Sequence, residues 1–137
     1  MNRRLLSLLL RLLGTLPLLA ETGADSVLTL ARRVNDRFMR VYADPTRPTF
    51  VKKVRPSSLW TRAVYYEGLM ALYAIDPRQY YLDYADRWGA FHHWAPRDGV
   101  TTTDADNQCC AQTYLERYAM TGDTLMACRV KANLEHQ

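Results

Sequence analysis

Hydrophobic residues recur every three or four positions along much of the chain, a spacing that places them on one face of an α-helix. The first such stretch begins after an Asp/Ser cap at 25–26 and ends before "ADPTRP"; its apolar positions are Val27, Leu30, Ala31, Val34, Phe38, Val41 and Tyr42. The second, "LWTRAVYYEGLMALYAI", is apolar around most of its circumference. We therefore expect it to be largely buried, with Ser57 or Ser58 as its cap.

Three further helices follow. Asp76 and Pro77 have the residue types of a cap and a first helical position, and they precede "RQYYLDYADRWGAFHHW". After the loop "APRDGVTTT", a fourth helix is expected from about Asp104 to Met120, ended by Gly122. Asp123 should begin a fifth helix that continues to the end of the chain.

The pattern predicts an all-α fold. "TFVKKVRPSS" is expected to be a loop with a short extended piece, and no stretch alternates strongly enough to be a central strand. The expected helix starts near Ser58 and Asp104 lie 46 positions apart, which exceeds the period of 34 of a tetratricopeptide repeat. This spacing suits longer helical hairpins arranged in a solenoid or a closed toroid.

The first twenty residues have the pattern of a secretory signal peptide. "MNRRLLSLLLRLLGTLPLLAETGADS" has a basic start, a Leu-rich centre and a small residue at Ala20. Arg11 interrupts the apolar run, and a spanning helix needs about 20 apolar residues, so stable membrane insertion is not expected. The alternative is a basic amphipathic helix that lies on a membrane or a partner. We expect residues 1–20 to be the signal, residues 21–137 the domain, and the location periplasmic or secreted.

The composition changes this picture little. Hydrophobic residues make up 48% and charged residues 23%, as in a globular protein. Of the net charge of +4, three positive charges come from Arg3, Arg4 and Arg11, so no nucleic-acid surface is expected. Nine Tyr and three Trp supply aromatic faces of the kind on which carbohydrate rings stack.

The stretch "TTTDADNQCCAQTY", 101–114, concentrates polar chemistry at a helix start. It allows three interpretations: a capping box of Thr103 and Asp106, a metal site, or one wall of a sugar-binding pocket. The three cysteines lack the spaced pairs of a zinc site, so buried, inert thiols are expected and no metal.

Three stretches of the chain together resemble a known family. "RPSSLWTRAVYYEGLMALY", "YLDYADRWGAFHHWAPRDGVTTTDADNQCCAQTYLERYAMTGD" and "RVKANLEHQ" look like the N-terminal portion of the unsaturated glucuronyl and rhamnogalacturonyl hydrolases, glycoside hydrolase families 88 and 105. The resemblance implies a six-hairpin (α/α)6 toroid, and an enzyme that removes terminal 4,5-unsaturated uronic acid from lyase-generated oligosaccharides without a metal or organic cofactor.

The resemblance also suggests site residues. Asp106 matches the first of the family's two key aspartates and is the expected catalytic residue. Asn107, Trp60, Trp94 and His92 are the candidates for substrate binding, with core packing as the alternative for the tryptophans and a C-terminal cap for the histidine. Since a helix N-terminus stabilises a charged carboxylate, Asp106 suits sugar binding better than unaided proton donation.

The match to a second aspartate is expected beyond Gln137. We therefore expect these residues to hold an incomplete toroid and to be an inactive, truncated fragment, with self-association through the open edge as a possible consequence. The alternative function is a non-catalytic helical-hairpin module that binds a carbohydrate or a peptide.

The basic and Leu-rich blocks at the N-terminus lead to the first prediction. Mass spectrometry of the exported protein should show a mature chain that begins close to Glu21. A cytoplasmic product that retains Met1 would contradict the signal-peptide interpretation.

Overall fold

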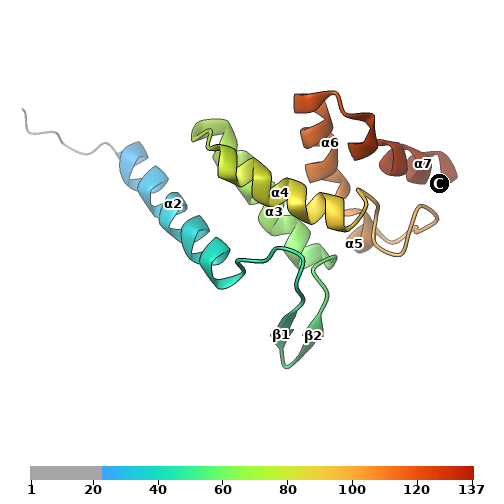
Figure 1. Ribbon diagram of the computed structural model, residues 1–137, viewed down its shortest axis with the longest axis horizontal. Helices are drawn as coiled ribbons and strands as arrows, with labels where there is room; N and C mark the ends of the chain where they lie inside the picture. Colours follow the sequence, from blue (N-terminus) through green and yellow to red (C-terminus); the bar gives the residue numbers. More distant parts are fainter. Residues whose placement is uncertain (1–22) are drawn as a thin grey trace, which may run out of the picture. The chain divides into compact units, whose positions relative to one another are not determined.

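The computed structural model describes residues 23–137, so the predicted signal peptide lies outside the described residues. The chain divides into two units, Met1–Leu30 and Ala31–Gln137. The first helix among the described residues is α2 (Gly23–Val41), whose residues belong partly to each unit. The α-helices and strands are labelled in Figure 1.

The order of elements confirms the all-α expectation. After α2 come a two-stranded antiparallel hairpin, β1 (Thr49–Val51) and β2 (Lys53–Arg55), and then only helices. These are α3 (Trp60–Ile75), α4 (Gln79–Phe91), α5 (Ala105–Gln108), α6 (Ala111–Thr121), the short 3-10 helix η1 (Thr124–Met126) and α7 (Cys128–His136). Among residues 23–137, no helix is both long and apolar enough to span a bilayer.

The aromatic core joins α3, α4 and α6. Trp88 of α4 is fully buried and stacks on Tyr66 of α3, with ring centroids 4.0 Å apart and planes at 15°. Tyr114 of α6 lies on another side of the indole, 5.3 Å away between centroids. The periodicity of the sequence predicted a helix in each of these three regions because the buried positions recur at helical spacing.

Helix α2 packs through fewer apolar residues than its pattern predicted. Phe38 stacks on Tyr65 of α3 at 3.5 Å between ring centroids, and the Tyr65 hydroxyl donates to Asn35 Oδ1 at 2.7 Å. Val34 and Val41, from the predicted apolar face, are exposed instead. The packed face of this helix is therefore partly polar.

Asp76 does not cap α4, contrary to prediction. The N-cap position is Arg78, without a side-chain cap bond. The buried Asp76 carboxylate instead accepts two hydrogen bonds from Arg32 of α2, at 2.8 and 2.7 Å, and others from Arg78 and Tyr81. The Arg32 guanidinium, with these other donors, holds the pKa of Asp76 well below its usual value.

Helices α4 and α6 are joined by a second bidentate ion pair. Arg117, with its side chain only 5% exposed, donates from Nε to Asp86 Oδ1 at 2.7 Å and from Nη2 to Oδ2 at 2.8 Å. The C-terminus of α6 follows the prediction: Gly122 has φ 71°, and its N–H donates to Tyr118 O at 2.8 Å. Only a residue that tolerates the left-handed region ends a helix in this way without strain.

Removal of the Asp86 carboxylate should be strongly destabilising. Asp86→Ala leaves the Arg117 guanidinium buried without its partner, which should lower the free energy of unfolding by about 3–5 kcal/mol. Asp83→Ala is the matched control, since Asp83 is exposed on the same helix and, among residues 23–137, its carboxylate accepts only from Gln79 Nε2. Its effect in urea denaturation should stay within about 0.5 kcal/mol; equal losses in the two variants would contradict the role given to the ion pair.

Candidate functional site

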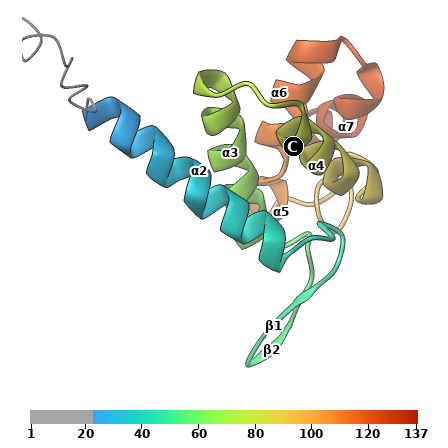
Figure 2. The same ribbon diagram turned by 60° about the vertical axis from the view of Figure 1, so that its left-hand side comes forward.

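Helices α3 and α6 lie side by side and run in the same direction (Figure 2). Thr113 Oγ1 of α6 donates to Glu67 Oε1 of α3 at 2.9 Å, and these residues are 46 positions apart. Farther along the same pair, Tyr73 of α3 lies near Arg117 of α6. This register agrees with the 46-residue spacing of the expected helix starts, and it puts α5 beside the first half of α3.

The predicted helix from Asp104 to Met120 is interrupted. α5 is only four residues long, and Cys109 and Cys110 separate it from α6. The cap is Asp104, whose Oδ1 accepts from Asp106 N at 2.9 Å, so the predicted capping box of Thr103 and Asp106 was wrong. A four-residue helix also has little macrodipole, which weakens the expected effect of the helix end on Asp106.

The amides that follow Asp106 hold the preceding loop in place. Asn107 is buried, and its Nδ2 donates to Asp98 Oδ2 at 3.0 Å and to Thr102 Oγ1 at 3.2 Å. Gln108 Nε2 donates to Thr102 O and to Asn133 Oδ1. Asn133 of α7 completes the network with bonds of 2.8 Å to the carbonyls of residues 100 and 102. Asn107 thus has a structural role, and its predicted contact with substrate stays a prediction.

Asp106 differs from its neighbours because its side chain is exposed and unengaged. Within residues 23–137 no hydrogen bond or ion pair reaches its carboxylate. The Asp106 charge does act on Cys109: burial, then the charge of Glu67, then that of Asp106 raise the pKa of this thiol. Both carboxyl groups therefore lie around Cys109, and Asp106 is the one that faces solvent.

Glu67 is the site residue to which the sequence gave least weight. Burial raises its pKa, and the hydrogen bond from Thr113 partly opposes this shift. Its position in an otherwise apolar helix was the only signal in the sequence. Its hydrogen-bond partner is Thr113 of α6.

Trp60 lies at the start of α3 and is 43% exposed. The buried face of α3 carries Arg62, Ala63, Tyr66, Leu69, Met70 and Leu72, so this helix is buried on one side rather than all round. An exposed indole at the end of α3 that lies near α5 is available to a ligand. The predicted role of Trp60 in sugar binding is consistent with this placement and stays a prediction.

His92 joins the end of α4 to the base of the β-hairpin. Ser57 Oγ donates to Thr46 O at 2.8 Å and lies 2.9 Å from His92 Nε2, so the imidazole must donate from Nε2. Trp88 Nε1 donates to Ser57 O at 2.9 Å. Burial, followed by the charges of His93 and Arg62, lowers the pKa of His92, which favours the neutral ring. Ser57 therefore fixes the hairpin instead of capping α3, whose N-cap is Leu59.

Trp94 packs against the helix that it follows. The backbone N–H of Trp94 donates to Gly89 O at 2.8 Å. The Trp94 ring lies so close to Gly89 that a Cβ there would be only 2.3 Å from it. Trp94 also meets Tyr114 edge to face at 5.2 Å. This reversal requires positive φ at His93 (56°) and Trp94 (53°), so α4 ends before them, at Phe91. Substrate contacts of His92 and Trp94 stay predictions, and both residues have structural roles.

The cysteines are free, but they are not all buried. Cys110 is buried, and this burial raises its pKa to about 11, whereas Cys109 is half-buried and Cys128 is exposed. The expectation of three buried thiols was therefore wrong for Cys128. Among the described residues, no group of three His, Cys, Asp or Glu side chains could hold a metal ion.

The different roles of Asp104 and Asp106 can be tested by stability. Asp104→Ala removes the cap and should cost about 1 kcal/mol. Asp106→Ala removes no contact and should change the free energy of unfolding by less than about 0.5 kcal/mol. Thermal and urea unfolding of the two variants would measure this difference. A larger loss at Asp106 would show that its carboxylate has a structural partner.

Comparisons with known proteins agree with this architecture. The family model described as Glycosyl Hydrolase Family 88 matches residues 30–137. A solved structure titled "Glycosyl hydrolase family 88 from Bacteroides vulgatus" is similar, with a TM-score of 0.66 and 25% sequence identity. The match covers 82% of this chain and 34% of that one, and no curated protein matches. The helical hairpins of the present chain therefore correspond to part of the family's all-α toroid. Because the family model covers most of the described residues and the folds agree, the chain belongs to Glycosyl Hydrolase Family 88.

Proposed function

We propose that this glycosyl hydrolase removes a terminal 4,5-unsaturated uronic acid from oligosaccharides produced by polysaccharide lyases. The observation that carries the proposal is the exposed, unengaged carboxylate of Asp106, in a family 88 chain. This carboxylate lies on α5, beside the first half of α3, which begins with the half-exposed Trp60. A free carboxylate and an exposed indole together suit a sugar ring with hydroxyl groups.

The proposed reaction is hydration of the vinyl ether. A carboxylic acid protonates C4, water adds at C5, and the resulting hemiketal opens and releases the remaining sugar. Positive charge develops on the ring in the transition state, and a nearby carboxylate stabilises such charge. We assign this role to Asp106, together with acceptance of hydrogen bonds from sugar hydroxyls, and ring stacking to Trp60. The reaction as written requires neither a metal nor an organic cofactor.

Proton donation places a different demand on a carboxyl group. A general acid must retain its proton near the working pH, which requires burial or a second carboxylate close by. Asp106 is exposed, and the half-buried carboxyl of Glu67 accepts a hydrogen bond from Thr113. We therefore propose that residues 1–137 bind the unsaturated sugar but do not turn it over unaided. The basic, Leu-rich start of the chain supports a periplasmic or secreted location.

Binding and turnover of an unsaturated uronyl disaccharide test the proposal. Calorimetric titration of the 137-residue protein should show binding that Asp106→Asn and Trp60→Ala each weaken about ten-fold or more, equivalent to about 1.4 kcal/mol. The ultraviolet absorbance of the alkene should stay constant. Loss of absorbance that depends on Asp106 would show that this chain already contains a complete catalytic site.

The saturated disaccharide is the matched ligand control. A hydrolase site should prefer the unsaturated ring, because that ring is flattened toward the geometry of the transition state. The alternative function, a non-catalytic carbohydrate-binding module, should bind both disaccharides equally well. Binding that does not respond to Asp106 or Trp60 would place the site elsewhere on the chain.

A further inference from the structure

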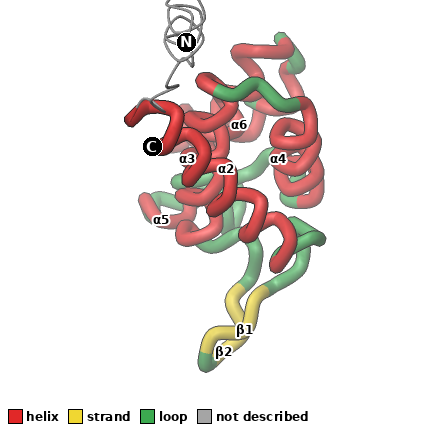
Figure 3. The backbone as a smooth tube through the Cα atoms, turned by 90° about the vertical axis from the view of Figure 1, so that its left-hand side faces the viewer, coloured by secondary structure: helices red, strands yellow, loops and turns green. Residues whose placement is uncertain are grey.

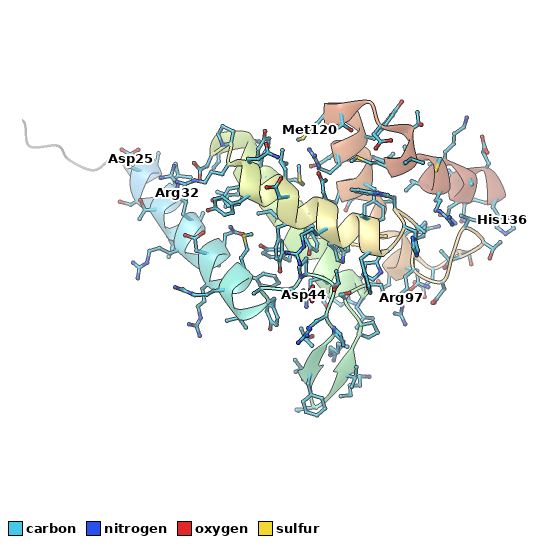
Figure 4. All side chains as sticks on the ribbon, viewed as in Figure 1. Asp25, Arg32, Asp44, Arg97, Met120 and His136 are labelled. Carbon is cyan, nitrogen blue, oxygen red and sulfur yellow. The ribbon has the colours of Figure 1, made fainter. Side chains whose placement is uncertain are left out.

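A hollow of about 460 Å³ lies at the base of the β-hairpin, apart from Asp106 and Trp60. Its lining residues belong to the continuous segment 41–50, and they include Tyr42, Asp44, Arg47, Pro48 and Phe50. The volume is within the range of about 300–1,000 Å³ that is typical of small-molecule sites. Figure 4 labels Asp44 next to the strands, and Figure 3 shows the hairpin projecting beyond the helices.

The two aromatic residues of the hollow are in different states. Tyr42 is held in place: the Arg62 guanidinium lies 4.8 Å from its ring centroid, Phe38 packs beside it, and its carbonyl accepts from Tyr84 Oη at 2.6 Å. Phe50 of β1 is 76% exposed. A fixed ring and a solvent-exposed ring in one hollow offer apolar faces that a sugar ring would cover.

The charged residues of the hollow favour an acidic ligand. Thr46 donates to Asp44 Oδ1 from its N–H and its hydroxyl, at 3.0 and 2.7 Å, and these bonds lower the pKa of Asp44. Two guanidinium groups lie near the Asp44 carboxylate: Arg47 Nε in the hollow, 3.4 Å from Oδ2, and Arg87 Nη2 of α4 outside its lining, 3.8 Å from Oδ1. The Arg47 side chain is 82% exposed and faces Asp44 through Nε, so its two Nη groups can meet a carboxylate of a ligand.

The opposite face of the hairpin provides a comparison. Phe50 pairs with Val54 across the strands, whereas Val51 pairs with Lys53 and therefore points to the other side. The Ser57 bonds described above fix the base of the hairpin. Its two faces are distinct because successive side chains of a strand point to opposite sides. Lys53 thus carries the same charge as Arg47 without sharing the face that holds Phe50.

We propose that this hollow is a second binding site, which takes the uronate units of an acidic oligosaccharide. Phe50 and Tyr42 contact the sugar ring, and Arg47 binds its carboxylate. The hairpin leads through residues 56–59 to the start of α3, and the hairpin, that start and α5 gather at one end of the described unit (Figures 1 and 2). The inference rests on the proposed function for the class of ligand, and it adds a site that would select longer, charged substrates.

Titration with an unsaturated uronate tetrasaccharide from lyase-digested polyuronate tests the site. Arg47→Gln and Phe50→Ala should each weaken binding by about three- to ten-fold. Lys53→Gln, the matched loss of one charge on the other face, should change affinity by less than about two-fold. A neutral glucose tetrasaccharide should bind at least about ten-fold more weakly than the acidic one. All three positions are exposed, and thermal unfolding should show each variant folded as the unsubstituted protein.

Several outcomes would overturn the inference. Unchanged affinity in Arg47→Gln and Phe50→Ala would remove the site, and an equal loss in Lys53→Gln would reduce the effect to general charge attraction. The inference would also be wrong if the protein did not bind the tetrasaccharide and the hairpin instead bound phosphatidylglycerol vesicles or formed a dimer of the chain. The two proposals can fail separately. If Arg47→Gln weakens tetrasaccharide binding but disaccharide binding does not depend on Asp106, only the hollow is supported. If disaccharide binding depends on Asp106 but Arg47→Gln leaves tetrasaccharide binding unchanged, only the hydrolase site is supported.

Discussion

The indole of Trp88 connects the separate parts of residues 31–137. Its ring stacks on Tyr66 of α3 and contacts Tyr114 of α6, while its N–H donates to the carbonyl of Ser57 at the base of the hairpin. A buried indole N–H needs an acceptor, so the same side chain that fills the core also fixes a loop. Together with the bonds of Ser57 to Thr46 and His92, this hydrogen bond fixes the base of the hairpin beside the helices.

Local signals in the sequence predicted the helices well and their caps poorly. Gly122 ends α6 as predicted because the left-handed conformation is a local requirement. Asp76 and Ser57 have residue types typical of caps, yet each is used by a distant partner: Arg32 is 44 positions from Asp76, and His92 is 35 from Ser57. A carboxylate that meets a guanidinium group, as Asp76 meets Arg32, gains more than a cap bond provides. No local pattern contains that information.

At the candidate site, too, the sequence predicted the local features better than the long-range contacts. Asp106 stood out by its residue type and its resemblance to a family motif, and the 46-residue spacing of the expected helix starts equals the separation of Thr113 and Glu67 in the structure. The sequence did not reveal that the amides of Asn107 and Gln108 hold a loop, because Gln108 shares that network with Asn133, which arrives from another helix. A polar stretch of uniform appearance thus contains mostly structural residues and one free carboxylate.

The reversal after α4 has a consequence for the order of folding. Two successive non-glycine residues with positive φ, His93 and Trp94, are unfavourable by about 1–2 kcal/mol each until tertiary contacts hold them. Those contacts, Gly89 and Tyr114, come from two different helices. The turn should therefore close only after α4 and α6 have come together, so the segment that carries Asp106 reaches its final position late, on a scaffold that is already formed.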